Sequence, residues 1–298
     1  MTGARLTEGA RRGRGLGLVE LTVALMLGLL LLAGAITLLV QSRTERRAGS
    51  ALTDGQAALD SAVELLSREL RLAGNYGLTN RAELIRGVAS ALQQRSPLDA
   101  TIGNSCANNF SVALGEYVGA QLRGNPSLAC AALPVAVGSD VLVVRRAGAA
   151  AARGRIRLRS NRLGGEILAA SEADPATDPG SETRELVVEA YYVAASAAHP
   201  RAATEWALHR VRLGAASDGR PEMRDQVLVP GIALLRVEFG LDLDGDGSAD
   251  LYALPGAPEL SRGRIVSARL TLGAPVTADG SAGRALVRVV QLRNATVR

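Results

Sequence analysis

The stretch Arg14-Gly15-Leu16-Gly17-Leu18-Val19-Glu20-Leu21 joins a basic, polar leader to a long apolar run. The run continues over residues 21–40, where Thr22 and Thr37 are the polar residues. At about 1.5 Å per residue these 20 residues form a helix about 30 Å long, enough to cross a bilayer. A bare carboxylate in a membrane segment costs roughly 3 kcal/mol. We therefore expect Glu20, at the start of the run, to have a partner or a function.

Two other kinds of N-terminal segment compete with this interpretation. A secretory signal peptide has an apolar core of about 7–15 residues, followed by a small-residue cleavage site. Here the apolar run is longer, and the chain continues with Gln41-Ser42-Arg43. A plain membrane anchor explains the run and its flanking arginines but leaves Glu20 unexplained, and it stays open as the main alternative.

The charge of the chain is concentrated in the leader. The chain contains no lysine, so all 34 basic residues are arginine, and the formal net charge is +5. Residues 1–15 hold four arginines and Glu8, a net of +3, which leaves +2 for the remainder. Arginines beside an apolar run are typical of the cytoplasmic flank of a membrane span. The C-terminal bulk is therefore expected outside the cytoplasm, and no nucleic-acid partner is expected.

A helical pattern continues beyond the apolar run. Apolar residues recur at spacings of three, four and seven from Leu52 to Ala73, with charged residues between them, which predicts one amphipathic helix face. We expect a single helix over residues 16–72, softened at Gly49 or Gly55 and about 85 Å long at the ideal rise. Gly74-Asn75 is the expected C-cap.

The sequence of residues 74–138 predicts a long connecting region, which contains both cysteines. Cys106 and Cys130 lie on the side of the span expected to face an oxidising compartment, which allows a disulfide. Closing a loop of this length would stabilise the fold by roughly 3 kcal/mol. Two free buried thiols are the alternative. A metal site is disfavoured because His199 and His209 are far away in the sequence.

From Ser139 onward the sequence predicts strands. Candidate strands are residues 140–146, 153–159, 185–193, 206–213, 232–241, 265–272 and 285–292. Arg155-Ile156-Arg157-Leu158-Arg159 alternates charged and apolar residues, as a half-buried strand does. Its arginines could also form a basic stripe for DNA, but aromatic residues are only 3% of the chain, which favours a solvated sheet face.

An acidic segment, Asp242-Leu243-Asp244-Gly245-Asp246-Gly247-Ser248-Ala249-Asp250, follows one of these strands. Carboxylates at alternate positions can surround one Ca²⁺, which takes six to eight oxygen ligands at about 2.4 Å. The candidate ligands are the side chains of Asp242, Asp244, Asp246 and Asp250 and the backbone carbonyl of Ser248. The bidentate glutamate of an EF-hand is replaced by Ala253. A bare turn is the alternative, since Asp-Gly pairs favour turns without any ion.

Gly15, Leu16 and Glu20 resemble the processing motif of type IV pilins and pseudopilins. In that family a prepilin peptidase cuts after the glycine and methylates the new N-terminus. Leu16 replaces the usual phenylalanine, and Leu18 matches the usual third residue. Further blocks resemble the PilW-type minor pilins, in the family's order. They are Arg68-Glu69-Leu70-Arg71-Leu72-Ala73-Gly74-Asn75-Tyr76-Gly77, Ser139-Asp140-Val141-Leu142-Val143-Val144-Arg145, Val229-Pro230-Gly231-Ile232 followed by Val237-Glu238-Phe239-Gly240-Leu241-Asp242, and Val290-Gln291-Leu292-Arg293-Asn294.

The resemblance implies an α+β, type IV pilin-like fold, in which a long N-terminal α-helix packs on an antiparallel β-sheet globular domain. We expect five segments along the chain. Residues 1–15 are a cytoplasmic leader peptide, 16–40 a transmembrane and filament-core helix, and 41–73 an amphipathic helix of the globular domain. Residues 74–138 connect to a β-rich C-terminal domain at 139–298.

The resemblance also implies a function. Minor pilins of this type prime type IV pilus assembly at or near the pilus tip, and the chain is not expected to be an enzyme. Expected partners are other minor pilins and the major pilin, the prepilin peptidase, the bacterial inner membrane and the pilus assembly platform. The expected location is the inner membrane with a periplasmic C-terminal domain, then the pilus and cell surface. Two alternatives stay open: a type II secretion pseudopilin, and a membrane-anchored, calcium-dependent adhesin.

Overall fold

The computed structural model describes residues 18–89, 102–106, 109–121, 128–150, 154–172, 179–196, 206–275 and 283–294. Helix α1 spans Leu18–Leu72 without interruption at Gly49 or Gly55. Its side chains are described for most of 18–32 and from Gly55 onward. The chain divides into two compact units, Met1–Thr53 and Asp54–Arg298, so that only the last part of α1 belongs to the unit that contains the strands.

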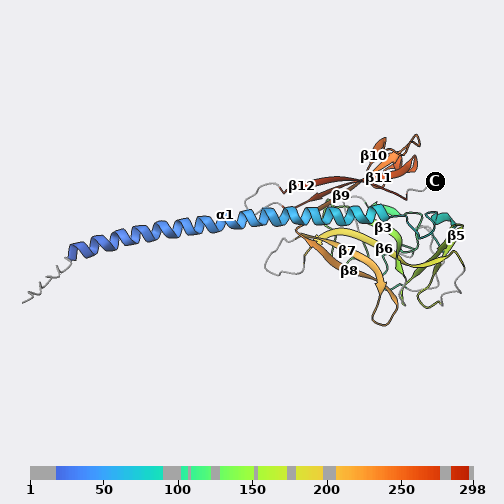
Figure 1. Ribbon diagram of the computed structural model, residues 1–298, viewed down its shortest axis with the longest axis horizontal. Coiled ribbons are helices and arrows are strands. Elements are labelled where there is room, and N and C mark those ends of the chain that lie inside the picture. Colours follow the sequence, from blue (N-terminus) through green and yellow to red (C-terminus); the bar gives the residue numbers. More distant parts are fainter. Residues whose placement is uncertain are drawn as a thin grey trace, which may run out of the picture. The chain divides into compact units, whose positions relative to one another are not determined.

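Twelve strands and two short 3₁₀ helices follow α1 in the described residues (Figure 1). The elements are η1 (Ala82–Leu84), β1 (Ile85–Arg86), β2 (Val118–Gln121), β3 (Val141–Ala150), β4 (Arg157–Asn161), β5 (Gly164–Leu168), β6 (Glu182–Ala195), β7 (Trp206–Ala215), β8 (Pro221–Pro230), β9 (Leu234–Asp242), β10 (Leu251–Ala253), η2 (Pro258–Ser261), β11 (Arg264–Gly273) and β12 (Ala285–Gln291).

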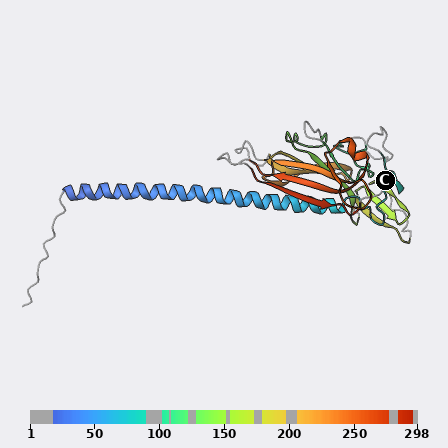
Figure 2. The same ribbon diagram turned by 90° about the horizontal axis from the view of Figure 1, so that it is seen from above.

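The strands form two sheets. The large sheet has eight strands, and its centre is β6, the longest strand, which pairs with β3 along one edge and with both β4 and β7 along the other. The small sheet has the order β10-β9-β11-β12. The turned view in Figure 2 shows its strands, in orange and red, running alongside the last turns of α1.

Each face of the large sheet buries a separate core, because successive side chains of a strand point to opposite faces. On one face, Tyr191 and Val193 of β6 pack with the small sheet and with the apolar stripe of α1 that runs from Leu59 to Ala73. On the other face, Tyr192 and Ala194 pack with residues that precede β3, such as Leu114 and Leu128. Residues 74–138 therefore supply two strands and much of one core as well as connecting α1 to β3.

The predicted fold class, a long helix packed on one antiparallel sheet, is wrong. The unit that begins at Asp54 consists mostly of strand, in two sheets, and β1 pairs with β5 in parallel. The contact of α1 with the sheets is short, because its buried stripe begins only at Leu59. The described side chains between Leu18 and Leu32 belong to the other unit and are exposed.

The strand predictions were accurate where apolar residues alternate or cluster. Ile156 and Leu158 are almost fully buried between half-exposed arginines, as the alternation predicted. Strand β8 was not predicted, because Pro221 and Pro230 bound a largely polar sequence. It forms along β7, where it is an edge strand, and prolines are tolerated at such edges.

Candidate functional site

The described N-terminal part of α1 presents an apolar surface. Leu18 and Leu31 are 81% and 76% exposed, and four leucines in succession, at 29–32, are each more than half exposed. Four consecutive residues point to every side of a helix, so the surface is apolar all round. Helices of this kind are normally buried against other apolar groups. We call the side chains of Leu18–Leu32 that the structure describes the apolar helix surface.

The predicted processing residues are only partly within the described part of the chain. Gly15 and Leu16 lie outside it. Glu20 lies in the third position of α1, but its side chain is not among those described. Cleavage after Gly15 and a role for the Glu20 carboxylate therefore stay predictions.

The predicted transmembrane helix, and with it the predicted inner-membrane location, is not supported. Among the residues that the structure describes, no helix is long and apolar enough to cross a membrane. The predicted span at 21–40 continues into residues whose side chains lie outside the description.

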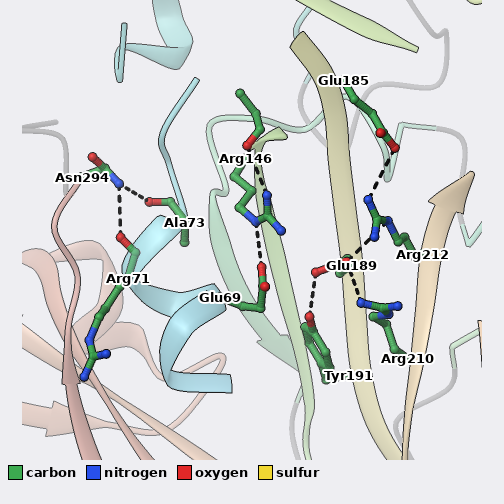
Figure 3. Close-up of polar contacts among 11 residues, drawn as sticks. Glu69, Arg71, Ala73, Arg146, Glu185, Glu189, Tyr191, Arg210, Arg212 and Asn294 are labelled. Atoms are coloured by element: carbon green, nitrogen blue, oxygen red, sulfur yellow. Dashed lines mark hydrogen bonds and ion pairs between the residues drawn. The ribbon is translucent and has the colours of Figure 1, made fainter. Parts of the chain in front are cut away.

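The other end of α1 is attached to the large sheet by a nearly buried ion pair, which lies beside a second group of buried charges in Figure 3. Arg146 of β3 places its Nε 2.7 Å from Oε2 of Glu69, and both side chains are nearly buried. Next to this pair, Glu189 of β6 is fully buried. Its carboxylate lies 3.2 Å from Nη1 of Arg210 and 3.5 Å from Nε of Arg212.

Tyr191 completes this buried polar cluster. Its hydroxyl donates to Oε2 of Glu189 at 2.6 Å. Burial, together with the neighbouring carboxylates, raises the pKa of Tyr191 far above its usual range, so the hydroxyl keeps its proton and remains a donor. A charged residue inside the apolar strand sequence of β6 was the signal that could have predicted a buried ion pair at Glu189.

Two sequence blocks that are far apart meet where α1 ends (Figure 3). Nδ2 of Asn294 donates to the carbonyl of Ala73 at 3.1 Å and to that of Arg71 at 3.4 Å. Gly74 follows with φ +74° and donates its N–H to the carbonyl of Arg145. A Cβ at Gly74 would lie 3.1 Å from the ring of Tyr117. The segment predicted to cap α1 thus ties it to both sheets.

The acidic loop is organised around Asp242, whose side chain is almost completely buried. Its carboxylate accepts hydrogen bonds from the N–H groups of Gly245 at 2.6 Å and Gly247 at 3.1 Å, and from Nη2 of Arg264 at 2.8 Å. Burial alone would raise the pKa of Asp242, but these bonds outweigh it and lower the pKa. Oδ2 of Asp250 accepts from the N–H of Leu243 at 2.7 Å, which closes the turn.

The loop brings some of the predicted calcium ligands together. One carboxylate oxygen from each of Asp242, Asp244 and Asp250 lies within 4.8 Å of the others. Asp246 and Ser248 are not part of this group, and the carboxylate of Asp246 instead accepts from the N–H of Ser248 at 2.6 Å. The hydrogen bonds described above, from backbone N–H groups to the aspartate carboxylates, hold the turn together without an ion. Calcium binding stays a prediction.

Cys106 and Cys130 form a disulfide, with their Cα atoms 4.4 Å apart. Cys130 is buried in the core on the far side of the large sheet from α1, and the partly buried Cys106 packs against that core. Nδ2 of Asn104 donates to the carbonyls of Cys130 and Met223, so the bridged segment is attached to β8. The disulfide links the described segment at 102–106 to the one that begins at 128, a structural role.

Comparison of the chain with known protein families and with curated proteins found no match.

Proposed function

We propose that this chain is a filament subunit of the minor-pilin kind, which enters a type IV pilus through its N-terminal helix and helps to start pilus assembly. The observation that carries the proposal is the apolar helix surface, Leu18–Leu32, which follows directly on the Gly15-Leu16 motif. Helices of neighbouring subunits would cover this surface and remove its apolar side chains from water.

Glu20 supplies the specificity of that packing. Cleavage after Gly15 would create a positively charged amine at Leu16, which could pair with Glu20 of a neighbouring subunit among apolar side chains. Loss of one partner of a buried pair costs about 3–5 kcal/mol. The pair would therefore set the axial position of each helix, while the leucines supply the affinity.

The structure of the second unit is compatible with this role. The ion pair between Glu69 and Arg146 joins the end of α1 to the large sheet, and Asn294 joins it to the small sheet. A force on this end of the helix is therefore transmitted to both sheets of the unit. Within the part of the chain that the structure describes, the ionised side chains of this junction pair with one another.

The first test measures processing and incorporation in the organism's own pilus system. Mass spectrometry of the mature protein should find Leu16 at the N-terminus, methylated. The variant Glu20→Ala should be processed but lost from sheared filaments, by about 100-fold if 3 kcal/mol is lost at about 1.4 kcal/mol per tenfold change. Thr22→Ala is the matched control, since its hydroxyl bonds the Val19 carbonyl of the same helix, one turn away at 2.9 Å. Normal recovery of Glu20→Ala in filaments would refute the proposal.

The second test removes the chain from a strain in which pilus retraction is blocked. Sheared surface pili should be lost or severely reduced, and the wild-type chain should restore them. Unchanged pili, with a defect in exported proteins instead, would assign the chain to a type II secretion machine.

A further inference from the structure

Strand β12 is an open edge of the small sheet. Among the described residues it pairs with β11 alone and ends the order β10-β9-β11-β12. The other edge strands in the described ranges are less accessible: β1, β2 and β10 have two to four residues, and β8 is bounded by prolines and partly covered by Gly103. β12 has seven residues, Ala-Leu-Val-Arg-Val-Val-Gln, without proline. Long edges of this kind can pair with another chain.

The register of β12 shows which backbone groups are directed outward. Leu292 donates to the carbonyl of Val266, and Ala274 donates to that of Arg284, so even-numbered residues of β12 exchange hydrogen bonds with β11. In an antiparallel pair the intervening residues direct their N–H and C=O away from the partner. Ala285, Val287, Val289 and Gln291 therefore present backbone donors and acceptors along the open edge.

The side chains at this edge are partly apolar. Val287 and Val289 are 55% and 50% exposed, on the side of the sheet opposite to the core. Across the pair lie Thr271 and Arg269 of β11. An added strand would cover the exposed flank of both valines, a contact typical of cross-strand pairs.

The charged side chains of β12 itself and of the residues beside it are all basic, while the acidic loop contacts the end of the strand through the Gly247 carbonyl and Nε2 of Gln291. Arg284, Arg288 and Arg293 are exposed, and residues 283–294 contain no aspartate or glutamate. Arg288 lies on the same side of β12 as Leu286 and Val290, between the two exposed valines. A partner strand that is itself basic would be repelled here, while an acidic one would be attracted.

We propose that β12 binds an extended, acidic strand of another polypeptide, which adds to the small sheet beside Val287 and Val289 and pairs a carboxylate with Arg288. The partner's backbone bonds the outward N–H and C=O groups of Val287 and Val289. Its sequence alternates apolar residues, opposite the valines, with acidic residues on the Arg288 side. This binding site does not depend on the proposed function in pilus assembly.

The test uses the full-length chain in mild detergent and two fluorescein-labelled peptides, Thr-Val-Glu-Val-Glu-Val-Thr and the same peptide with arginine in place of glutamate. By fluorescence anisotropy the acidic peptide should bind at least tenfold more tightly, and the affinity should fall as salt is added. Val289→Pro removes one outward N–H and should weaken binding at least tenfold. Arg288→Glu should reverse the preference between the peptides.

Arg236→Glu is the matched control, because Arg236 is exposed in β9 of the same sheet but away from the open edge. It should leave the affinity unchanged. Unaltered fluorescence of the single tryptophan, Trp206, checks that each variant is folded. If Val289→Pro fails this check, the peptide preference of Arg288→Glu still tests the proposal, since that substitution leaves the backbone donors and acceptors intact. Equal binding of both peptides, no binding of either, or no reversal by Arg288→Glu would overturn the proposal.

Discussion

Breaking the ion pair between Glu69 and Arg146 is expected to lower the free energy of unfolding of the Asp54–Arg298 unit by about 3 kcal/mol. The two side chains are only 11% and 14% exposed, and their nearest atoms are 2.7 Å apart. With charge centres about 4 Å apart and an effective dielectric constant near 20, their attraction is about 4 kcal/mol. Removal of one partner ends this attraction but leaves the other charge desolvated. Measured losses for buried pairs are about 3–5 kcal/mol, and the remaining exposure favours the lower end.

The perturbation is a double-mutant cycle with Glu69→Leu and Arg146→Met. Each single variant should lose about 3 kcal/mol. The double variant should lose no more than one single variant, because two apolar side chains leave no charge unpaired. The coupling energy would then be at least about 3 kcal/mol, as for residues in direct contact.

The assay is urea unfolding of the full-length chain in mild detergent, followed by the fluorescence of Trp206, which packs at the margin of the same core as Leu66 and Leu70. Arg68→Met is the control, because Arg68 is exposed on the same helical turn and should change the stability by less than about 0.5 kcal/mol. Additive losses in the double variant, or single losses below about 1 kcal/mol, would refute the role assigned to the pair.

Four further results are expected from the same unfolding measurement. Replacement of Cys106 and Cys130 by serine should cost about 3 kcal/mol, since the bridge closes a loop with a sequence separation of 24; an unchanged midpoint would contradict this. Asn294→Ala should cost about 1 kcal/mol and Asn294→Asp more, because the carboxylate would face two carbonyls. The lowered pKa of Asp242 stabilises the fold above the ordinary aspartate value near 4, so stability should fall as the pH drops below about 4, and Asp242→Asn should flatten this dependence. If the acidic loop binds calcium, 1 mM calcium should raise the midpoint in wild type but not in Asp250→Asn; no shift would assign the loop to a bare turn.

The sequence predicted the elements with a clear local period. Alternation around Ile156 and Leu158 placed a strand where β4 forms, and the apolar stripe from Leu59 to Leu70 marked the face of α1 that is buried. The sequence contains two cysteines, Cys106 and Cys130, so only one disulfide within the chain was possible. These features follow from residues close together in sequence or from simple counting.

The candidate sites were predicted less completely. The acidic loop was identified from its spacing, but the ion-pair partner of Asp242 is Arg264, which follows 22 residues later. The expected single sheet was wrong, because nothing in the local pattern of β9 or β11 says that they pair with each other and not with β6. Strand β8 lacked an apolar pattern and forms only because β7 lies beside it.

The sequence by itself determined where apolar and charged residues recur, and therefore which faces of α1 and of the strands are buried. Only the tertiary structure decided which charges meet: Glu69 with Arg146, Glu189 with Arg210, and Asn294 with the end of α1. The physical reason is distance. A hydrophobic period is set by the geometry of the helix or strand itself, whereas a buried ion pair or an edge such as β12 exists only after distant segments have packed together.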